Sequence, residues 1–200
     1  MVNEKVQTEL DRARKFGEQV EQIVISNHYT DGERDTVLLA YWELVSEFHR
    51  GIHTLIQNEF YGSAFALVRP VVESVVRAYI AIMGSEEDVK RLREDTYKLN
   101  FKEIGPKIDA AFGLDHFMEN FLNEKTRSAL HSYTHAGLQQ LGRRFRGGQV
   151  RPNYSDEELV EVIHSTTSAL FMLSNLVTKH FQFEDDWKKV TDIYVEWGKN

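Results

Sequence analysis

Three charged side chains interrupt the most apolar segment of the sequence. Arg69, Glu73 and Arg77 are the only charged residues between Tyr61 and Met83, and they follow one another at four-residue steps. Residues four apart share one face of an α-helix, so Glu73 can bind both arginines and leave guanidinium donors free for an anion. The pattern predicts an anion-binding stripe for phosphate or carboxylate. The alternative is a structural ion triad or a solvated stripe.

Two pairs of histidines show the same four-residue spacing, in the segments HRGIH and HSYTH. Each pair faces one way on a helix, and helical bundles can hold metals between histidines and carboxylates of facing helices. The metal-binding alternative therefore joins both pairs to one glutamate: His49, His53, Glu73, His131 and His135. The other interpretation is that these histidines are packed or hydrogen-bonded side chains. The leading hypothesis needs no metal and no other cofactor.

The second histidine pair also suits phosphodiester chemistry. Arg127 lies one helical turn before His131. A neutral imidazole can take the proton of a ribose 2′-hydroxyl, and an arginine can stabilise the charge that develops on phosphorus. The candidate catalytic residues are His131, His135, Arg127 and Glu73, with Glu73 as the group that orients the others. The alternative is that His131 flanks the core and Arg127 is solvated.

A strongly basic, loop-like stretch follows this segment over residues 143–154. It carries four arginines around two glycines, which suits a mobile phosphate-binding loop. The candidate anion-binding residues are therefore Arg69, Arg77, Arg143, Arg144 and Arg146. The alternative is an exposed loop whose charge maintains solubility.

Hydrophobic periodicity predicts that helices position these side chains. Apolar stripes with a 3.6-residue period predict long helices over about 3–26, 31–58, 61–83, 155–181 and 185–197. Shorter helices are expected at 85–97 and 100–113, and 114–142 is one helix or two with a break near Asn123. The segment 61–83 is apolar nearly all round, as is typical of a central helix, and Pro70 predicts a kink in it. We predict one all-α domain over residues 1–200, a bundle of about seven helices without strands.

Composition narrows the classes of protein. There is no cysteine, which excludes disulfides, thiol catalysis and thiolate metal sites. A net charge of −7 argues against a general nucleic-acid coat protein but leaves room for a local basic groove. No apolar run approaches the roughly 18 residues that span a bilayer, and residues 1–16 lack a signal-peptide core. We expect a cytoplasmic protein.

Two segments resemble a known group of proteins. GSAFALVRPVVESVVRAYIAI (62–82) and ALHSYTHAGLQQLGRR (129–144) are similar to an uncharacterised bacterial helical family. Its pattern is an Arg-Pro-x-x-Glu-x-x-x-Arg helix and a later helix with x-Tyr-Thr-His-x-Gly. The resemblance covers roughly residues 41–176. More distantly, the chain resembles the superfamily of higher-eukaryote and prokaryote nucleotide-binding (HEPN-like) domains, which are usually dimeric helical bundles.

Many members of that superfamily are metal-independent ribonucleases of toxin–antitoxin and antiphage systems. Glu73 and Arg77 match its Glu-x-x-x-basic element, and Arg127, Ser128 and His131 match its arginine-to-histidine element with a shorter spacing. The resemblance implies a homodimer that acts on RNA or a nucleotide, in stress or phage defence, with no membrane partner. The two other hypotheses are a non-catalytic module that binds a ligand or a partner, and the metal-binding bundle described above.

Overall fold

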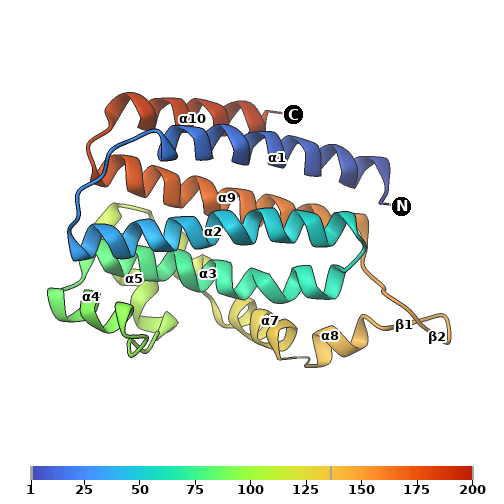
Figure 1. Cartoon of the computed structure of the whole chain (residues 1–200). Coiled ribbons are helices and arrows are strands. Elements are labelled where there is room, and N and C mark those ends of the chain that lie inside the picture. Colours follow the sequence, from blue (N-terminus) through green and yellow to red (C-terminus); the bar gives the residue numbers. More distant parts are fainter. Residues whose placement is uncertain (1, 136, 200) are drawn as a thin grey trace.

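The computed structural model describes residues 2–135 and 137–199 as an all-α bundle. The body consists of five long helices that run side by side (Figure 1): α1 (Glu4–Ile25), α2 (Glu33–Gln57), α3 (Tyr61–Met83), α9 (Asp156–His180) and α10 (Glu184–Gly198). All five were predicted from the apolar stripes, with bounds that differ by at most a few residues. The helical class of the fold is confirmed.

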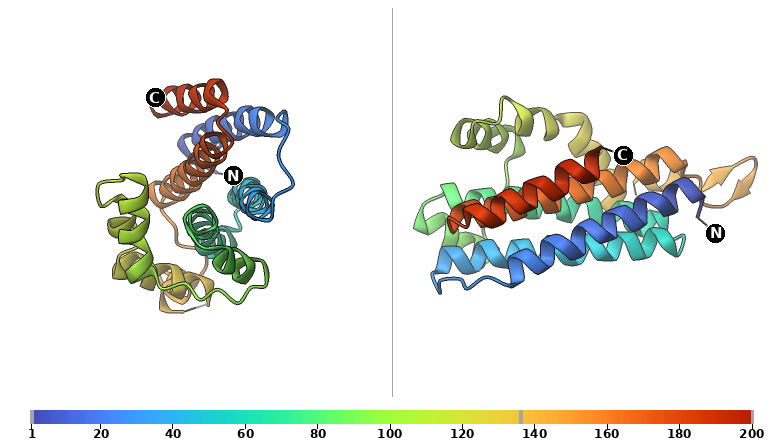
Figure 2. Two further views of the ribbon diagram at one scale, coloured as in Figure 1. Left: turned by 90° about the vertical axis from the view of Figure 1, so that its left-hand side faces the viewer. Right: turned by 90° about the horizontal axis from the view of Figure 1, so that it is seen from above.

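Shorter elements connect α3 to α9. They are α4 (Glu86–Arg93), α5 (Phe101–Phe112), α6 (Phe117–Phe121), α7 (Glu124–Thr134), α8 (Leu138–Gly142), β1 (Phe145–Arg146) and β2 (Gln149–Val150). The described residues thus contain ten helices and one antiparallel hairpin, so the predicted count of about seven helices and the expected absence of strands were wrong. Figure 2 shows that α5, α6 and α7 form a layer on one side of the long helices.

Side-chain caps begin four of the described helices, α1, α4, α7 and α9. Ser85 and Ser155 each begin a capping box, with Asp88 and Glu158 as the reciprocal partners. Asn123 accepts a hydrogen bond from the backbone N–H of Thr126 and starts α7, which confirms the break expected there. These caps satisfy backbone donors that would otherwise have no partner at a helix start.

One helix start depends on a side chain of the preceding helix. The side chain of Asp109, on α5, accepts hydrogen bonds from the backbone N–H groups of Met118 and Glu119, each at 2.8 Å. These are among the first donors of α6, so a buried carboxylate on α5 fixes α6 against it. This contact builds the layer that covers one side of α3.

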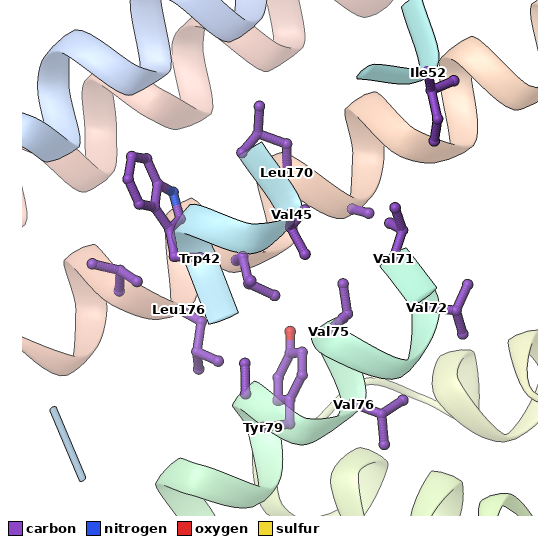
Figure 3. Close-up of a cluster of buried hydrophobic side chains, with 14 of the residues drawn as sticks. Trp42, Val45, Ile52, Val71, Val72, Val75, Val76, Tyr79, Leu170 and Leu176 are labelled. Carbon is purple, nitrogen blue, oxygen red and sulfur yellow. The ribbon is translucent and has the colours of Figure 1, made fainter. Parts of the chain in front are cut away.

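The core lies where α2, α3 and α9 meet (Figure 3). Val45, Val75 and Leu170, one from each helix, are buried in this cluster. The indole Nε1 of Trp42 donates to the hydroxyl of Ser174 at 2.9 Å, so the one polar atom of this ring is satisfied inside the core. Both α3 and α9 are buried on more than one side, which agrees with the nearly continuous apolar sequence of α3. Pro70 lies inside α3, and the helix continues through it.

The C-terminal aromatics cover α1. Phe16 contacts Tyr194 and Trp197 at ring-centroid distances of 5.9 Å and 6.0 Å, and Phe171 stacks on Tyr194 at 3.7 Å. These rings close the core on that side. None of the described helices is both long and apolar enough to cross a lipid bilayer.

Candidate anion-binding cavity

A proline and a threonine join the two helices that carry the candidate site. Pro70 has no N–H, so the carbonyl of Ala66 lacks its usual donor four residues on. The hydroxyl of Thr134, at the end of α7, lies 3.4 Å from this carbonyl and 3.0 Å from the carbonyl of Leu130. A single hydroxyl therefore shares its proton between its own helix and α3. This contact fixes α7 beside the centre of α3.

A double-mutant cycle tests this contact. Thr134→Val should lower the free energy of unfolding by about 1 kcal/mol, because the Ala66 carbonyl loses its donor. In a Pro70→Ala background the cost should shrink, since alanine at this position would supply the missing backbone N–H to that carbonyl. Urea unfolding of the four variants measures both values. Equal costs in both backgrounds would contradict the coupling.

Close approach of two backbones shapes the end of α7. A Cβ atom on Gly137 would lie 2.6 Å from the hydroxyl oxygen of Ser132 and 3.1 Å from its Cα. The N–H of Gly137 donates to the carbonyl of Ser132 at 2.7 Å. The glycine of the YTHxG segment is therefore needed because no side chain fits there. This turn ends α7 directly after the histidine pair.

The predicted stripe on α3 meets the predicted histidine on α7. The Nε of Arg69 donates to Glu73 Oε1 at 2.8 Å, and its NH1 lies 2.7 Å from His131 Nδ1. The side chains of Arg69 and Glu73 are 27% and 28% exposed, so the pair lies at the edge of the core where solvent and ligands can reach it. Arg69, Glu73 and His131 thus form one cluster.

The contact with Arg69 determines which ring nitrogen of His131 carries the proton. A guanidinium has only donors, so Nδ1 of His131 must accept with its lone pair. The ring is then neutral and carries its proton on Nε2. His131 therefore offers a hydrogen-bond donor at Nε2, while the base at Nδ1 is occupied by Arg69. The ring of His135 lies 4.4 Å from that of His131, centroid to centroid, and is exposed.

A cavity of about 440 Å³ opens beside this cluster. Cationic groups come from three helices: Arg69 from α3, Lys102 from α5 and Arg127 from α7, against one acidic group, Glu124. The remaining walls combine polar and apolar side chains: Ser128 and His131, and Val72, Phe101, Leu122 and Leu130. The cavity therefore combines cationic and apolar walls, which suits an anion attached to a less polar body.

Arg127, which lines this cavity, has one donor without a partner. Its Nε atom is buried and has no hydrogen-bond partner among the described residues. A buried N–H without a partner costs about 1–3 kcal/mol, and such donors in native proteins generally have a partner. In Arg69, the NH2 nitrogen likewise makes no hydrogen bond within the described part of the chain, since Nε and NH1 hold Glu73 and His131. Two guanidinium groups are thus available to one bound anion.

Arg77, the third member of the stripe, does not reach the cavity. Its NH1 donates to the carbonyl of Tyr97 at 3.4 Å. It also lies beside the hydroxyl of Tyr41, where burial raises the pKa of the tyrosine and the Arg77 charge opposes that rise. Arg77, which was proposed with Arg69 as an anion-binding residue, therefore does not line the cavity that Arg69 lines.

The basic segment 143–154 is not a loop around the cavity. Arg143 donates to Glu158 at 2.6 Å, so its positive charge is paired with this carboxylate. Its guanidinium also lies over the ring of Tyr154. Arg144 lies against Gly62 at the start of α3, where a Cβ on Gly62 would be 2.5 Å from its NH2. Neither lines the cavity. The side chain of Arg146 lies outside the described part of the structure.

The two histidine pairs lie in different places, which rules out the shared metal site. His49 and His53 are buried on α2, and a Cβ on Gly17 of α1 would lie 2.9 Å from His49 Cε1. His131 and His135 are at the end of α7, where His131 contacts Arg69. Within residues 2–135 and 137–199, no three histidine, aspartate or glutamate side chains are placed to hold a metal ion. The hypothesis that these five residues form one metal site is therefore wrong.

Sequence reasoning missed the residues that α5 contributes. Lys102 and Phe101 begin α5, about thirty residues beyond Arg69 in the chain, and line the same cavity as Arg127. Their types carry no local signal, since an exposed lysine and a half-buried phenylalanine are ordinary at a helix start. Only the packing of α5 and α6 over α3 brings them to the site.

Comparison with known proteins places the chain at the level of a family. No curated protein and no solved structure matches it. Residues 42–198 match the model described as "Family of unknown function (DUF6988)". The match includes α3, α5 and α7, which together line the cavity. The chain therefore belongs to this family of unknown function.

Proposed function

We propose that the chain binds the phosphate of a nucleotide or of RNA in the cavity between α3, α5 and α7. The observation that carries the proposal is the buried, unpartnered Nε of Arg127 at a cavity that Arg69 and Lys102 also line. Arginine presents donors in a planar fork that matches phosphate oxygens, and two such groups can hold one dianion. The Nε2–H of His131 adds a neutral donor.

The size of the cavity favours more than a bare anion. At about 440 Å³ it falls within the roughly 300–1,000 Å³ range of small-molecule sites, and an inorganic phosphate would leave most of it empty. The rest of the ligand would lie against the apolar wall, where Phe101 offers an aromatic ring. This combination favours a phosphate ester over a free phosphate ion.

Calorimetric titration with adenosine 5′-monophosphate tests the proposal, with adenosine as the uncharged comparison. The wild type should bind the monophosphate and not adenosine. Arg127→Gln should weaken binding about 10-fold, because one charge-assisted hydrogen bond is worth roughly 1.5–3 kcal/mol. Arg151→Gln, which removes an exposed arginine outside the cavity, is the matched control and should bind as the wild type does. Equal binding of monophosphate and adenosine would reject phosphate recognition.

A second candidate is cleavage of RNA at the bound phosphate without a metal. The specific observation in its favour is that His131 and Arg69 are in contact at the edge of the same cavity as Arg127. In the observed arrangement His131 would donate a hydrogen bond from Nε2 to a phosphate oxygen. If Arg69 moved from Nδ1 to the ligand, Nδ1 could take the proton of the attacking ribose 2′-hydroxyl, and the imidazolium formed would give a proton to the leaving 5′-oxygen. The resemblance to HEPN-like ribonucleases supports this candidate and, with it, a role in bacterial stress or phage defence.

His131→Ala decides between binding and cleavage. It should abolish cleavage of labelled single-stranded RNA in the presence of a metal chelator, while monophosphate binding persists through the arginines. The control is His116→Ala, because His116 is exposed and pairs with Glu119 in the same turn. Unchanged cleavage by His131→Ala would reject the catalytic assignment. No cleavage by the wild type would leave a binding protein.

A further inference from the structure

A second cavity, of about 210 Å³, lies between α1 and α2. Every side chain that lines it is polar: Arg14, Glu18 and Glu21 come from α1, and Arg50, Thr54 and two histidines come from α2. The histidines are His49 and His53, which are only 1% and 3% exposed. No residue of the phosphate cavity lines this second one. The two cavities are therefore separate.

A threonine on α9 determines which nitrogen of His49 carries the proton. The hydroxyl of Thr167 donates its single proton to the carbonyl of Ile163 at 2.8 Å. It must therefore accept from Nε2 of His49, which lies 3.2 Å away. Burial, followed by the charges of His53 and Arg50, holds the pKa of His49 well below its ordinary value, so the ring is neutral. Nδ1 of His49 then carries a lone pair and is an acceptor.

A glycine keeps the wall beside this acceptor free of a side chain. A Cβ atom on Gly17 would lie 3.1 Å from Nδ1 of His49 and 2.9 Å from its Cε1, so any larger residue would press on the ring. Nδ1 of His49 makes no hydrogen bond within residues 2–135 and 137–199. The lone pair is thus available to a donor in the cavity.

The second imidazole also has a nitrogen without a partner. Nε2 of His53 is buried and makes no hydrogen bond to the part of the chain that the structure describes. Buried polar groups in native proteins generally have a partner, which is protein, water or ligand. The ring centroids of His49 and His53 are 4.0 Å apart. One small molecule beside the two rings can therefore serve both.

The charges at the cavity favour an uncharged ligand. The charge of Arg14 adds to burial in lowering the pKa of His53 to about 4, so a cation beside the imidazoles would be opposed in the same way. An anion would meet the carboxylates of Glu18 and Glu21 and the lone pair of His49, which cannot donate. A metal ion lacks ligands, because no three histidine, aspartate or glutamate side chains of the described residues are placed to hold one.

A primary amide group meets these requirements. It carries two N–H donors and one carbonyl acceptor. One N–H serves Nδ1 of His49. The other N–H serves a lone pair on Nε2 of His53, or the carbonyl serves a proton there, so either tautomer of His53 finds a partner. A hydroxyl has a single proton and would serve both rings in only one of these tautomers. The volume, below the roughly 300–1,000 Å³ of typical small-molecule sites, limits the ligand to a few atoms.

We propose that the cavity between α1 and α2 binds a small uncharged molecule through a primary amide group, with Nδ1 of His49 as acceptor and Nε2 of His53 as the second contact. Glu21 and Arg50 pair with each other at this cavity, so neither needs a charged ligand. The proposal is independent of phosphate binding, since the two cavities share no residue.

Titration with acetamide, followed by ¹⁵N NMR of the imidazoles, tests the proposal. Acetate and acetamidinium have the same shape with opposite charges. In the wild type, millimolar acetamide should shift the signals of His49 and His53 to saturation, and the two ions should not. His53→Leu should weaken acetamide binding at least about 10-fold, as measured on His49. His28→Gln replaces an exposed histidine and is the matched control, with wild-type binding expected.

Arg127→Gln separates this proposal from phosphate binding. It alters the other cavity and should leave acetamide binding unchanged. The absence of a saturable shift at up to about 100 mM acetamide would overturn the proposal and leave a cavity that holds only water. Tighter binding of acetate or acetamidinium would contradict an uncharged ligand, and equal binding of propan-2-ol would contradict an amide. Saturable shifts caused by zinc ions alone would assign the histidines to a metal instead.

Discussion

Acidification from pH 6.5 to about pH 4 is expected to remove roughly 3 kcal/mol of the free energy of unfolding through His53 alone. Burial, and then the charge of Arg14, lower the pKa of His53 to about 4, and its Nε2 has no hydrogen-bond partner in the described structure. His49 adds to the effect in the same direction. Burial, followed by the charges of His53 and Arg50, holds its pKa well below the ordinary value.

The sign of this pH effect follows from which state, folded or unfolded, binds more protons. In the unfolded chain both imidazoles take up a proton near pH 6.5, whereas in the folded chain His53 resists protonation until about pH 4. Between these values the unfolded state binds more protons, so stability falls as the pH falls. Well above pH 6.5 both states are neutral at these sites and the histidines contribute no pH dependence.

Urea unfolding at a series of pH values measures this effect. The slope of stability against pH should approach about 1.4 kcal/mol per pH unit for each fully linked histidine. His53→Leu removes one titrating group and should flatten the curve. His28→Gln replaces an exposed histidine and should leave the curve unchanged. A curve for His53→Leu that coincides with the wild type would show that the buried imidazole does not control acid stability.

Removing both cavity arginines is expected to abolish measurable phosphate binding. Arg69→Gln combined with Arg127→Gln should weaken adenosine monophosphate binding by about 100-fold or more, since each lost charge-assisted bond costs roughly 1.5–3 kcal/mol. Because both groups would hold the same anion, the two effects need not be additive. Arg69→Lys keeps the charge and loses the planar fork, so its binding should be intermediate.

The double variant should still fold. The Arg69–Glu73 pair is about one quarter exposed on each side chain, and ion pairs near solvent contribute little to stability. Glu73 would then be hydrated instead of buried without a partner. The matched control is Arg143→Gln with Arg151→Gln, which removes the same number of arginines from the basic segment 143–154. Wild-type affinity in the cavity variant, or loss of affinity in this control variant, would place phosphate binding elsewhere.

Much of the fold was predictable because local signals were strong. The helix expected over 61–83 is α3 as observed, since an apolar run begins at Tyr61 and ends before Gly84. The division of residues 114–142 was less visible. Asn123 signals one break. The start of α6, however, is fixed by the side chain of Asp109, which lies nine residues before the first backbone N–H that it binds. The turn at Gly137 depends on its close contact with Ser132. The two glycines at 147 and 148 are a hairpin signal, but two-residue strands are too short to show alternation.

The candidate site was predictable in part for a similar reason. Arg69, Glu73 and His131 belong to two segments with recognisable spacing, and the structure brings them together. Arg77 was misplaced because two four-residue steps advance about 80° around a helix and about 12 Å along it. That displacement takes Arg77 to Tyr41 and Tyr97. Lys102 and Phe101 reach the cavity only through packing that no local pattern encodes.

The unused donor of Arg127 offers the most direct test of the central claim. Arginine Nε–H resonances can be followed by NMR during titration with adenosine monophosphate, with Arg127→Lys to assign the signal. The Arg127 Nε–H signal should shift as phosphate supplies its missing acceptor, while the signal of Arg12, which already pairs with Glu9, stays in place. An unchanged Arg127 signal, or shifts confined to the arginines of the basic segment 143–154, would contradict a phosphate site between α3, α5 and α7.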